Sequence, residues 1–249
     1  TDTFMEEAAW QYMIWFYNLM AEVMVPSSST RKELVERGLD PLKAKPLPRW
    51  VDTTVFSPMK KTPDLWRAYG LDDAPKLLYV GRVSKEKNLE LLARSFASLV
   101  DDGGRADLVV VGDGPFRTEM ERILKGYPAF FTGFKTGEEL CALYASADVF
   151  VFPSATDTFG NVVLEAQASG LPVIVSDTGG PRELIVHGTT GFAVQNDDAE
   201  SLMKAMRLFI DDPSLRAEMG VRARLFTESK EMNPADYYCT ILQGGAAGF

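Results

Sequence analysis

The chain has 249 residues, of which 46% are hydrophobic, and its formal net charge at pH 7 is −9. This length and hydrophobic content allow one large domain or two small ones. The negative charge argues against a general nucleic-acid-binding surface, so a phosphate ligand would have to bind at a local cluster of basic side chains. Two distant cysteines and a single histidine argue against a zinc site and suit the reducing cytosol.

The amino-terminal segment 2–25 is predicted to be mainly helical, with aromatic and aliphatic side chains between Trp10 and Met20. The polar side chains of this helix recur on one stripe, which consists of Glu7, Gln11, Asn18 and Glu22. They argue against a membrane span, and their acidity favours a core helix over a membrane-surface helix. A short strand at Val23–Val25 and a helix at Ser29–Gly38 are predicted next.

The composition changes between residues 41 and 63, where five prolines interrupt the periodicity, so this stretch is the predicted linker. Thr62 and Pro63 then fit the N-cap and first positions of a short helix that ends at Gly70. Because the chain begins with Thr1 rather than Met, we expect a processed product or a piece of a longer protein, and we find no secretory signal peptide. The predicted domain boundaries divide the chain into residues 1–52, 53–230 and a tail at 231–249.

After the linker, apolar runs alternate regularly with helical patterns. Strands are predicted at Lys76–Val80, Leu108–Val111, Ala129–Thr132, Asp148–Phe152, Val173–Ser176 and Phe192–Val194. Helices are predicted at Glu86–Val100, Pro115–Lys125, Gly137–Ser146, Asn161–Ser169, Pro181–Val186, Asp198–Ile210 and Pro213–Thr227. Regular alternation with continuously apolar strands indicates an α/β fold with a doubly wound, Rossmann-like parallel sheet.

Three loops that follow predicted strands carry residues suited to binding an anion, because ligands of α/β sheets bind at the carboxyl ends of the strands. In the first loop, Tyr79–Asn88, Gly81 permits a tight turn and Arg82, Lys85 and Lys87 form a basic cluster. A guanidinium can bind phosphate with two parallel hydrogen bonds, and an ammonium acts as a point charge. The alternative is a solvated loop whose cations pair with nearby glutamates.

The second loop lies within Val109–Arg117. Gly112 and Gly114 give it a superficial likeness to a dinucleotide-binding fingerprint, but Arg117 stands in place of the third glycine. The next strand also lacks the acidic residue that would bind a ribose. We therefore reject a dehydrogenase, while the two glycines still indicate close backbone turns beside a site.

The third loop, Pro153–Gly160, leads into the predicted helix Asn161–Ser169, whose amino terminus is a favourable place for an anion. Glu165 lies within this otherwise apolar helix, and a buried carboxylate requires a partner. Asp157 lies eight residues before it. Two interpretations remain open: a functional pair of acids, or a structural pair in which Glu165 binds a cation and Asp157 caps a turn.

Several motifs are absent from the sequence. It contains no Walker A sequence, no Gly-x-Ser-x-Gly elbow and no Asp-x-Asp, the last being the simplest metal–diphosphate motif. We therefore predict no metal ion and no cofactor. His187 precedes Gly188 after a short helix, and we interpret it as a turn residue rather than a catalytic base.

Taken together, these segments resemble the family-4 retaining glycosyltransferases of GT-B fold, and specifically their carboxyl-terminal, donor-binding domain. The matching segments occur in the family's order over residues 80–194 and read GRVSKEKN, VVGDGP, FTGF, ADVFVFPS, TDTFGNVVLEAQASGLPVIVSDTGGPREL and GTTGF. Residues 1–52 resemble the end of the family's amino-terminal, acceptor-binding domain with its linker. Residues 53–230 would then be the donor-binding domain.

The resemblance implies a role for each matching residue at the first two loops. Arg82 and Lys87 match the basic pair that binds the donor diphosphate. Gly81 and Gly112 belong to the turns beside this pair and are predicted to contact the donor. Phe134 matches the strand end that borders the nucleotide base.

At the third loop, the resemblance implies contacts to the ribose, the phosphate and the sugar. Glu165 matches the second acid of the family's Glu-x7-Glu motif, which binds the ribose hydroxyls. Gly160, Asn161 and Val162 match the helix start whose amides approach the phosphate or the sugar. Asp157 stands where the family has the first glutamate, so it is one methylene shorter. Asp157 and Glu165 are the candidate catalytic acids.

The resemblance implies an enzyme that transfers a sugar from a UDP-, GDP- or ADP-sugar to an acceptor with retention. The acceptor, a sugar or a lipid, would bind the amino-terminal domain, so this chain by itself is expected to be inactive. The alternatives are a nucleotide-sugar 2-epimerase of GT-B fold and a non-catalytic nucleotide-sugar-binding module. We expect a cytoplasmic protein that binds no nucleic acid, with peripheral membrane association and self-association through the helix at residues 10–20 as further expectations.

Overall fold

The computed structural model describes residues 2–230. They belong to two compact units, and the boundary between them in the sequence lies between Arg49 and Trp50. The predicted boundary between residues 52 and 53 lies close to this point. The predicted tail at 231–249 lies outside the described residues.

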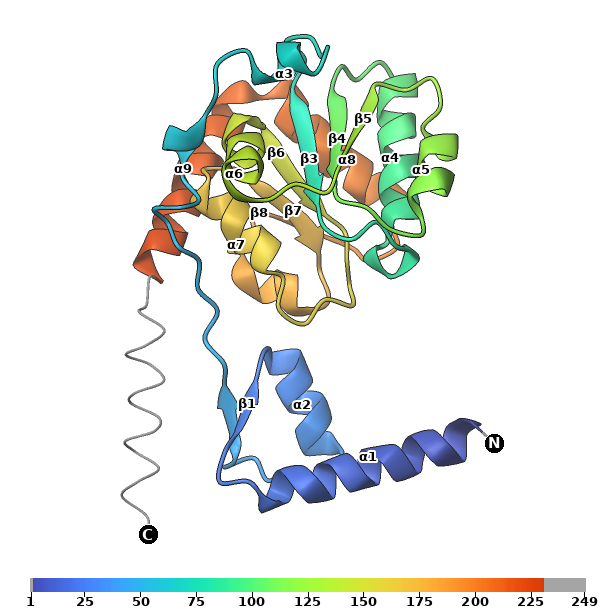
Figure 1. Ribbon diagram of the computed structural model, residues 1–249, viewed down its shortest axis with the longest axis vertical. Coiled ribbons are helices and arrows are strands. Elements are labelled where there is room, and N and C mark those ends of the chain that lie inside the picture. Colours follow the sequence, from blue (N-terminus) through green and yellow to red (C-terminus); the bar gives the residue numbers. More distant parts are fainter. Residues whose placement is uncertain (1, 231–249) are drawn as a thin grey trace. The chain divides into compact units, whose positions relative to one another are not determined.

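The amino-terminal unit contains two helices and a small parallel sheet (Figure 1). Its elements are α1 (Asp2–Leu19), β1 (Val23–Val25), α2 (Ser28–Glu36) and β2 (Ala44–Pro46). The prediction of an irregular linker was wrong for β2, because Val23 pairs with Ala44 and the Leu47 amide donates to the Val25 carbonyl at 2.7 Å. Pro46 is tolerated there because it ends a strand of only three residues.

Helix α1 buries little of its apolar surface within the described structure. Ile14 packs in a small core with residues of β1, α2 and β2. The exposed large side chains of the same segment are Phe4, Met5, Tyr12, Trp15, Phe16, Leu19 and Met20. None of the helices within residues 2–230 combines the length and the apolar character that a membrane span requires.

The larger unit is built on a six-stranded sheet in which every neighbouring pair is parallel (Figure 1). The strands are β3 (Lys76–Val80), β4 (Asp107–Val111), β5 (Ala129–Gly133), β6 (Val149–Phe152), β7 (Val173–Ser176) and β8 (Gly191–Val194), in the order β5-β4-β3-β6-β7-β8. This is the doubly wound order, so the predicted fold class is confirmed. Strands β3, β4, β6 and β7 are fully buried, which explains their continuous apolar sequences.

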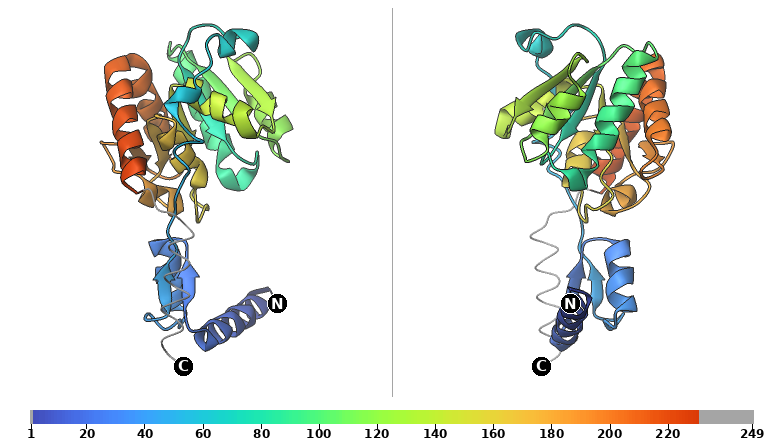
Figure 2. Two further views of the ribbon diagram at one scale, coloured as in Figure 1. Left: turned by 60° about the vertical axis from the view of Figure 1, so that its left-hand side comes forward. Right: turned by 90° about the vertical axis from the view of Figure 1, so that its right-hand side faces the viewer.

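Helices cover both faces of this sheet (Figure 2). They are η1 (Pro58–Lys60), α3 (Leu65–Ala68), η2 (Lys85–Lys87), α4 (Leu89–Asp101), α5 (Arg117–Ile123), α6 (Gly137–Ser146), α7 (Asn161–Ala168), η3 (Gly180–Leu184), α8 (Ala199–Asp211) and α9 (Pro213–Ser229). Helix α4 packs against α5 and α8, and α7 packs against α6 and α9. In α4, buried residues recur at the spacing of one helix face, as in Leu89, Leu92, Phe96 and Leu99.

Several predicted helices differ from the observed ones, most of them by one or two residues at an end. The segment Glu86–Val100 is divided into η2 and α4 at Asn88, whose φ of +56° interrupts a regular helix. The segment Pro181–Val186 forms the 3-10 helix η3, which begins one residue earlier. The helix predicted to begin at Thr62 and Pro63 begins instead after Asp64.

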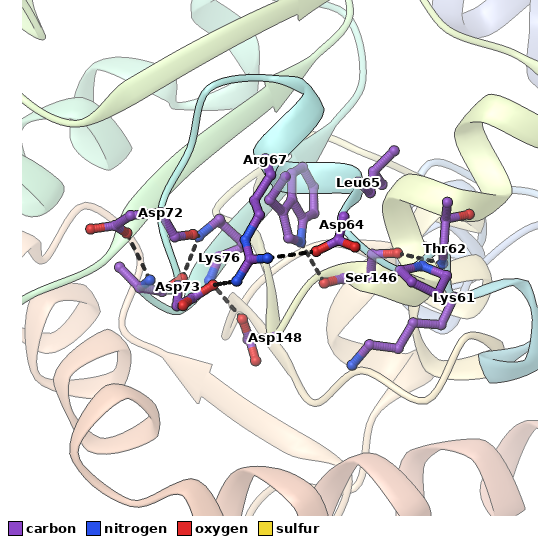
Figure 3. A pocket seen from close by; sticks show the side chains of 13 residues that line it. Lys61, Thr62, Asp64, Leu65, Arg67, Asp72, Asp73, Lys76, Ser146 and Asp148 are labelled. Carbon is purple, nitrogen blue, oxygen red and sulfur yellow. Dashed lines mark hydrogen bonds and ion pairs between the residues drawn. The ribbon is translucent and has the colours of Figure 1, made fainter.

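At the amino-terminal edge of the sheet, a pocket of about 230 Å³ is lined largely by charged side chains (Figure 3). Arg67 bridges Asp64 and Asp73 there, at 3.0 and 3.7 Å. Because all three side chains are mostly exposed, these ion pairs contribute little to stability. Lys76, by contrast, is almost completely buried at the first position of β3.

Candidate functional site

The sheet changes winding direction at β3, which lies between β4 and β6. The connections from β3 to β5 proceed toward one edge, and those from β6 to β8 proceed toward the other. The loops that follow β3 and β6 therefore leave the sheet on opposite sides of a crevice at the carboxyl ends of the strands. In open α/β sheets this crevice is the ligand site.

A pocket of about 600 Å³ opens at this edge. Six predicted site residues line it: Gly81, Arg82, Gly112, Phe134, Val162 and Glu165. They come from the loops after β3, β4 and β5 and from α7. The structure therefore brings a guanidinium, an exposed aromatic ring and a carboxylate to one cavity.

Two of the loops meet through backbone that only glycine allows. Gly112 has a φ of +132°, and a Cβ at this position would lie 1.9 Å from the carbonyl oxygen of Gly81. A Cβ at Gly114 would lie 2.4 Å from the carbonyl oxygen of Val83. The predicted close backbone turns at Gly112 and Gly114 are thus confirmed.

Gly112→Ala is expected to destabilise the domain because the added methyl group must displace the backbone of the loop after β3. Gly103→Ala is the matched control, since Gly103 also has a positive φ but no atom would lie within 4 Å of its Cβ. We expect the loss of unfolding free energy at Gly112 to exceed that at Gly103 by about 1–3 kcal/mol. Urea unfolding of both variants measures this, and equal losses would contradict the close contact.

Glu165 is partly buried on α7, and its Oε2 accepts a hydrogen bond of 2.9 Å from the Tyr144 hydroxyl. Its partner in the described structure is therefore a phenol, and the alternative of a cation partner was wrong. Burial raises the pKa of the Glu165 carboxyl, and the hydrogen bond from Tyr144 opposes this shift. A carboxylate with a raised pKa in a ligand pocket is typical of a functional group.

Asp157 pairs with Lys87 across the first and third loops. The Lys87 ammonium lies 2.8 Å from Asp157 Oδ1, and each side chain is 20% exposed. Asp157 Oδ2 is buried and has no hydrogen-bond partner within residues 2–230. Neither residue lines the pocket with Arg82. The two predicted polar groups are thus close to each other but outside this cavity.

The predicted helix start at Gly160 is also observed. Gly160 has a φ of +67° and directly precedes α7, and a Cβ there would lie 2.9 Å from Pro181 Cγ. Asn161 is the exposed first residue of α7, and Val162 lines the pocket. Gly160 therefore brings the amino terminus of α7 to the edge where the pocket opens.

Several residues of the site were not predicted from the sequence, among them Tyr144 and Lys135. Tyr144 on α6 holds Glu165, and Lys135 lines the pocket while its ammonium pairs with Glu139 at 3.0 Å. The only signal for Tyr144 was a tyrosine in a helix expected to pack on apolar strands. The hydroxyl of a buried tyrosine usually requires a hydrogen-bond partner. Lys135 directly follows Phe134 in the sequence, so it could have been predicted to lie beside the residue that borders the nucleotide base.

His187 belongs to no cluster of metal-ligating side chains within residues 2–230. His187 Nδ1 accepts a hydrogen bond of 3.0 Å from the amide of Ala193 on β8, which agrees with a structural rather than a catalytic role. Among residues 2–230, no three His, Cys, Asp or Glu side chains are grouped so that they could hold a metal ion.

Comparisons with known proteins agree with this geometry. A family model described as glycosyl transferases group 1 matches residues 65–226. The chain is 34% identical over 243 residues to sulfoquinovosyl transferase of Arabidopsis thaliana, covering 94% of this chain and 46% of that protein. It is 35% identical over 215 residues to GDP-mannose-dependent alpha-mannosyltransferase of Corynebacterium glutamicum, covering 85% and 49% respectively. Anabaena HepE, in a crystal structure with UDP and glucose, aligns with a TM-score of 0.84 and 19% identity, covering 99% of this chain and 68% of that chain.

The doubly wound sheet with its pocket at the switch point has the Rossmann-like fold of its structural neighbours, which are GT-B glycosyltransferases. The chain belongs to the family of glycosyl transferases group 1, whose model matches well over half of it. It spans about half the length of the curated relatives that it matches. These relatives are transferases, so they do not support the alternative of a nucleotide-sugar 2-epimerase.

Proposed function

We propose that this chain binds the nucleotide-diphosphate sugar donor of a retaining glycosyltransferase. The observation that carries the proposal is the 600 Å³ pocket, where Arg82, Phe134 and Glu165 meet at the carboxyl edge of the sheet. These three groups match the three parts of a nucleoside diphosphate: a guanidinium for the diphosphate, an aromatic face for the base and a carboxylate for the ribose hydroxyls.

In this proposal Arg82 stabilises the negative charge that develops on the leaving diphosphate, as preorganised positive charge can do. The Lys87 ammonium helps to stabilise the same negative charge, and Asp157 contacts the donor sugar. Their ion pair of 2.8 Å places the two groups side by side on the first and third loops. No metal ion and no cofactor is part of the proposal.

The acceptor, a sugar or a lipid, would bind a part of the whole protein that this chain does not supply. Binding of UDP, GDP and ADP to the 249-residue chain, measured by calorimetry, is the direct test. We expect one of them to bind and no acceptor to be glycosylated by the isolated chain. If none of the three binds, the proposal is overturned. A longer protein containing this chain that binds a nucleotide sugar but transfers it to no acceptor of a broad panel would instead support the non-catalytic binding module.

The two acids are expected to act on different halves of the donor. Glu165→Ala should weaken the nucleoside diphosphate and the intact nucleotide sugar equally, because both carry the ribose. Asp157→Ala should weaken only the nucleotide sugar, by about 1–3 kcal/mol for a lost hydrogen bond to a charged group. Calorimetry with both ligands decides this, with circular dichroism to confirm folding. Equal losses for both ligands in Asp157→Ala would show that Asp157 only orders its loop.

The exposed side chains of α1 form the basis of the remaining proposals on partners. We propose that this face, which includes Tyr12, Trp15 and Phe16, mediates self-association of the chain, because large apolar side chains gain free energy when they leave water. Peripheral contact with a membrane is the competing proposal for the same face. Sedimentation over a range of concentrations, with and without lipid vesicles, separates them. A strictly monomeric chain that does not bind vesicles would contradict both proposals.

A further inference from the structure

We propose that Tyr144 is a positioning residue that holds the Glu165 carboxylate in the orientation needed to bind the ribose hydroxyls of the donor. The inference rests on the proposed function, because it assigns a role to the contact beneath the ribose-binding acid. Tyr144 itself is fully buried and does not line the pocket, so it acts only through Glu165.

The contact joins two neighbouring helices. The Tyr144 hydroxyl on α6 donates to Glu165 Oε2 on α7 at 2.9 Å, while its distance to the other nearby acceptor, the Val162 carbonyl, is 3.5 Å. The shorter distance and the negative charge both favour the bond to the carboxylate. Within residues 2–230, no other hydrogen bond or ion pair to the Glu165 side chain is present. The phenol is thus the group that decides where this carboxylate points.

The phenol ring is itself fixed from two sides. Phe56 meets it edge-on, with ring centroids 5.7 Å apart and an interplanar angle of 85°. Phe150 of the central strand β6 lies against it with a centroid distance of 5.8 Å. A ring enclosed in this way keeps its hydroxyl in one place, because close-packed interiors allow little reorientation. Because the ring packs on the sheet and its hydroxyl binds Glu165, the sheet restricts the orientation of the Glu165 carboxylate.

The hydroxyl remains a hydrogen-bond donor at all working pH values. Burial, together with the negative charge of Glu165 and its hydrogen bond, raises the pKa of Tyr144 well above its ordinary value. A protonated phenol occupies one acceptor site of the carboxylate, which has about four. Enough acceptor sites remain for the two hydroxyl groups of a ribose.

The consequence for binding is preorganisation. A glutamate side chain loses conformational freedom when a ligand fixes it, and this loss weakens binding. The bond from Tyr144 fixes the carboxylate before the ligand arrives. Removing the hydroxyl should therefore weaken only those ligands that bind through Glu165.

The test compares each nucleoside diphosphate that the chain binds with its 2′,3′-dideoxy counterpart, which lacks both ribose hydroxyls. In calorimetry, Tyr144→Phe should raise the dissociation constant of the ribose form about three- to tenfold, and that of the dideoxy form by less than about twofold. In a Glu165→Ala background, Tyr144→Phe should cause no further loss with either ligand. The substitution keeps the packed ring, and thermal unfolding confirms that the variant is folded.

The matched control is Tyr127→Phe, because the Tyr127 hydroxyl also donates to a carboxylate, Asp101 Oδ2, at 2.9 Å but lies outside the pocket. It should leave both ligands unaffected. Equal losses for the ribose and dideoxy forms in Tyr144→Phe would show a merely structural role and overturn the inference. So would unchanged ribose affinity in Tyr144→Phe while Glu165→Ala weakens it, and this result would leave the proposed function intact. If the unsubstituted chain binds no nucleoside diphosphate, the proposed function fails and the inference fails with it.

Discussion

Arg82→Ala is expected to raise the dissociation constant for a nucleoside diphosphate about ten- to a hundredfold, because hydrogen bonds to charged groups contribute about 1.5–3 kcal/mol each. Arg82 is exposed and lines the pocket. Its backbone is held in place, since the Tyr79 hydroxyl donates to the Arg82 carbonyl at 2.9 Å. The guanidinium therefore extends from a fixed backbone and is available for a phosphate.

Arg105→Ala is the matched control for this measurement. Arg105 pairs with Asp72 at 2.9 Å and does not line the pocket, so its loss should leave the affinity unchanged. Calorimetry on both variants should be repeated in EDTA, where binding should persist because the positive charge is supplied by side chains. An affinity that is unaffected by Arg82→Ala, or that depends on Mg²⁺ or Mn²⁺, would contradict the proposed binding mode.

Lys76→Met is expected to lower the free energy of unfolding by about 3–5 kcal/mol, because removing one partner of a buried ion pair leaves the other charge uncompensated. The Lys76 ammonium lies 2.8 Å from Asp107 Oδ2, and their side chains are only 1% and 9% exposed. The same ammonium donates to the carbonyls of Asp72, at 2.7 Å, and Ala74. The ammonium is thus paired with one carboxylate and hydrogen-bonded to two carbonyls at the amino-terminal edge of the sheet.

Lys204→Met provides the comparison for an exposed pair. Lys204 pairs with Glu200 at 2.6 Å, but the two side chains are 68% and 69% exposed, so the expected loss is below about 1 kcal/mol. Urea unfolding of both variants measures the difference. In the double variant Lys76→Met with Asp107→Leu, part of the stability should return because no buried charge is left. Similar small losses for Lys76→Met and Lys204→Met would show that the buried pair does not stabilise the fold.

The fold was predictable because burial leaves a direct pattern in the sequence. Strands such as Val149–Phe152 are apolar throughout since helices cover both faces of the sheet. The errors occurred where local conformation departs from the regular pattern. Asn88 interrupts a predicted helix with a positive φ, and Ala44–Pro46 pairs with β1 although the prolines of residues 41–63 suggested a linker. A strand of only three residues that pairs with a distant strand leaves little recognisable pattern in the sequence.

The candidate site was only partly predictable. Gly112 and Arg82 lie in loops and Glu165 lies within a helix, at positions whose chemistry can be recognised in the sequence, and all three line the observed pocket. The pairing of Lys87 with Asp157, 70 residues away, was not predicted, since each had been expected to contact the ligand directly. Which charged groups meet depends on how the loops after β3 and β6 pack, and local residue patterns do not report that.

By itself, the sequence determined the alternation of strands and helices, the edge of the sheet that carries the site and the residue types gathered there, because hydrophobic periodicity and turn chemistry are local properties. The tertiary structure alone decided the partner of Glu165. Tyr144 lies 21 residues earlier in the chain and reaches the carboxylate only because α6 packs beside α7 on the sheet. A hydrogen bond requires two atoms within about 3 Å in a suitable direction, and only the packing of the helices sets that distance.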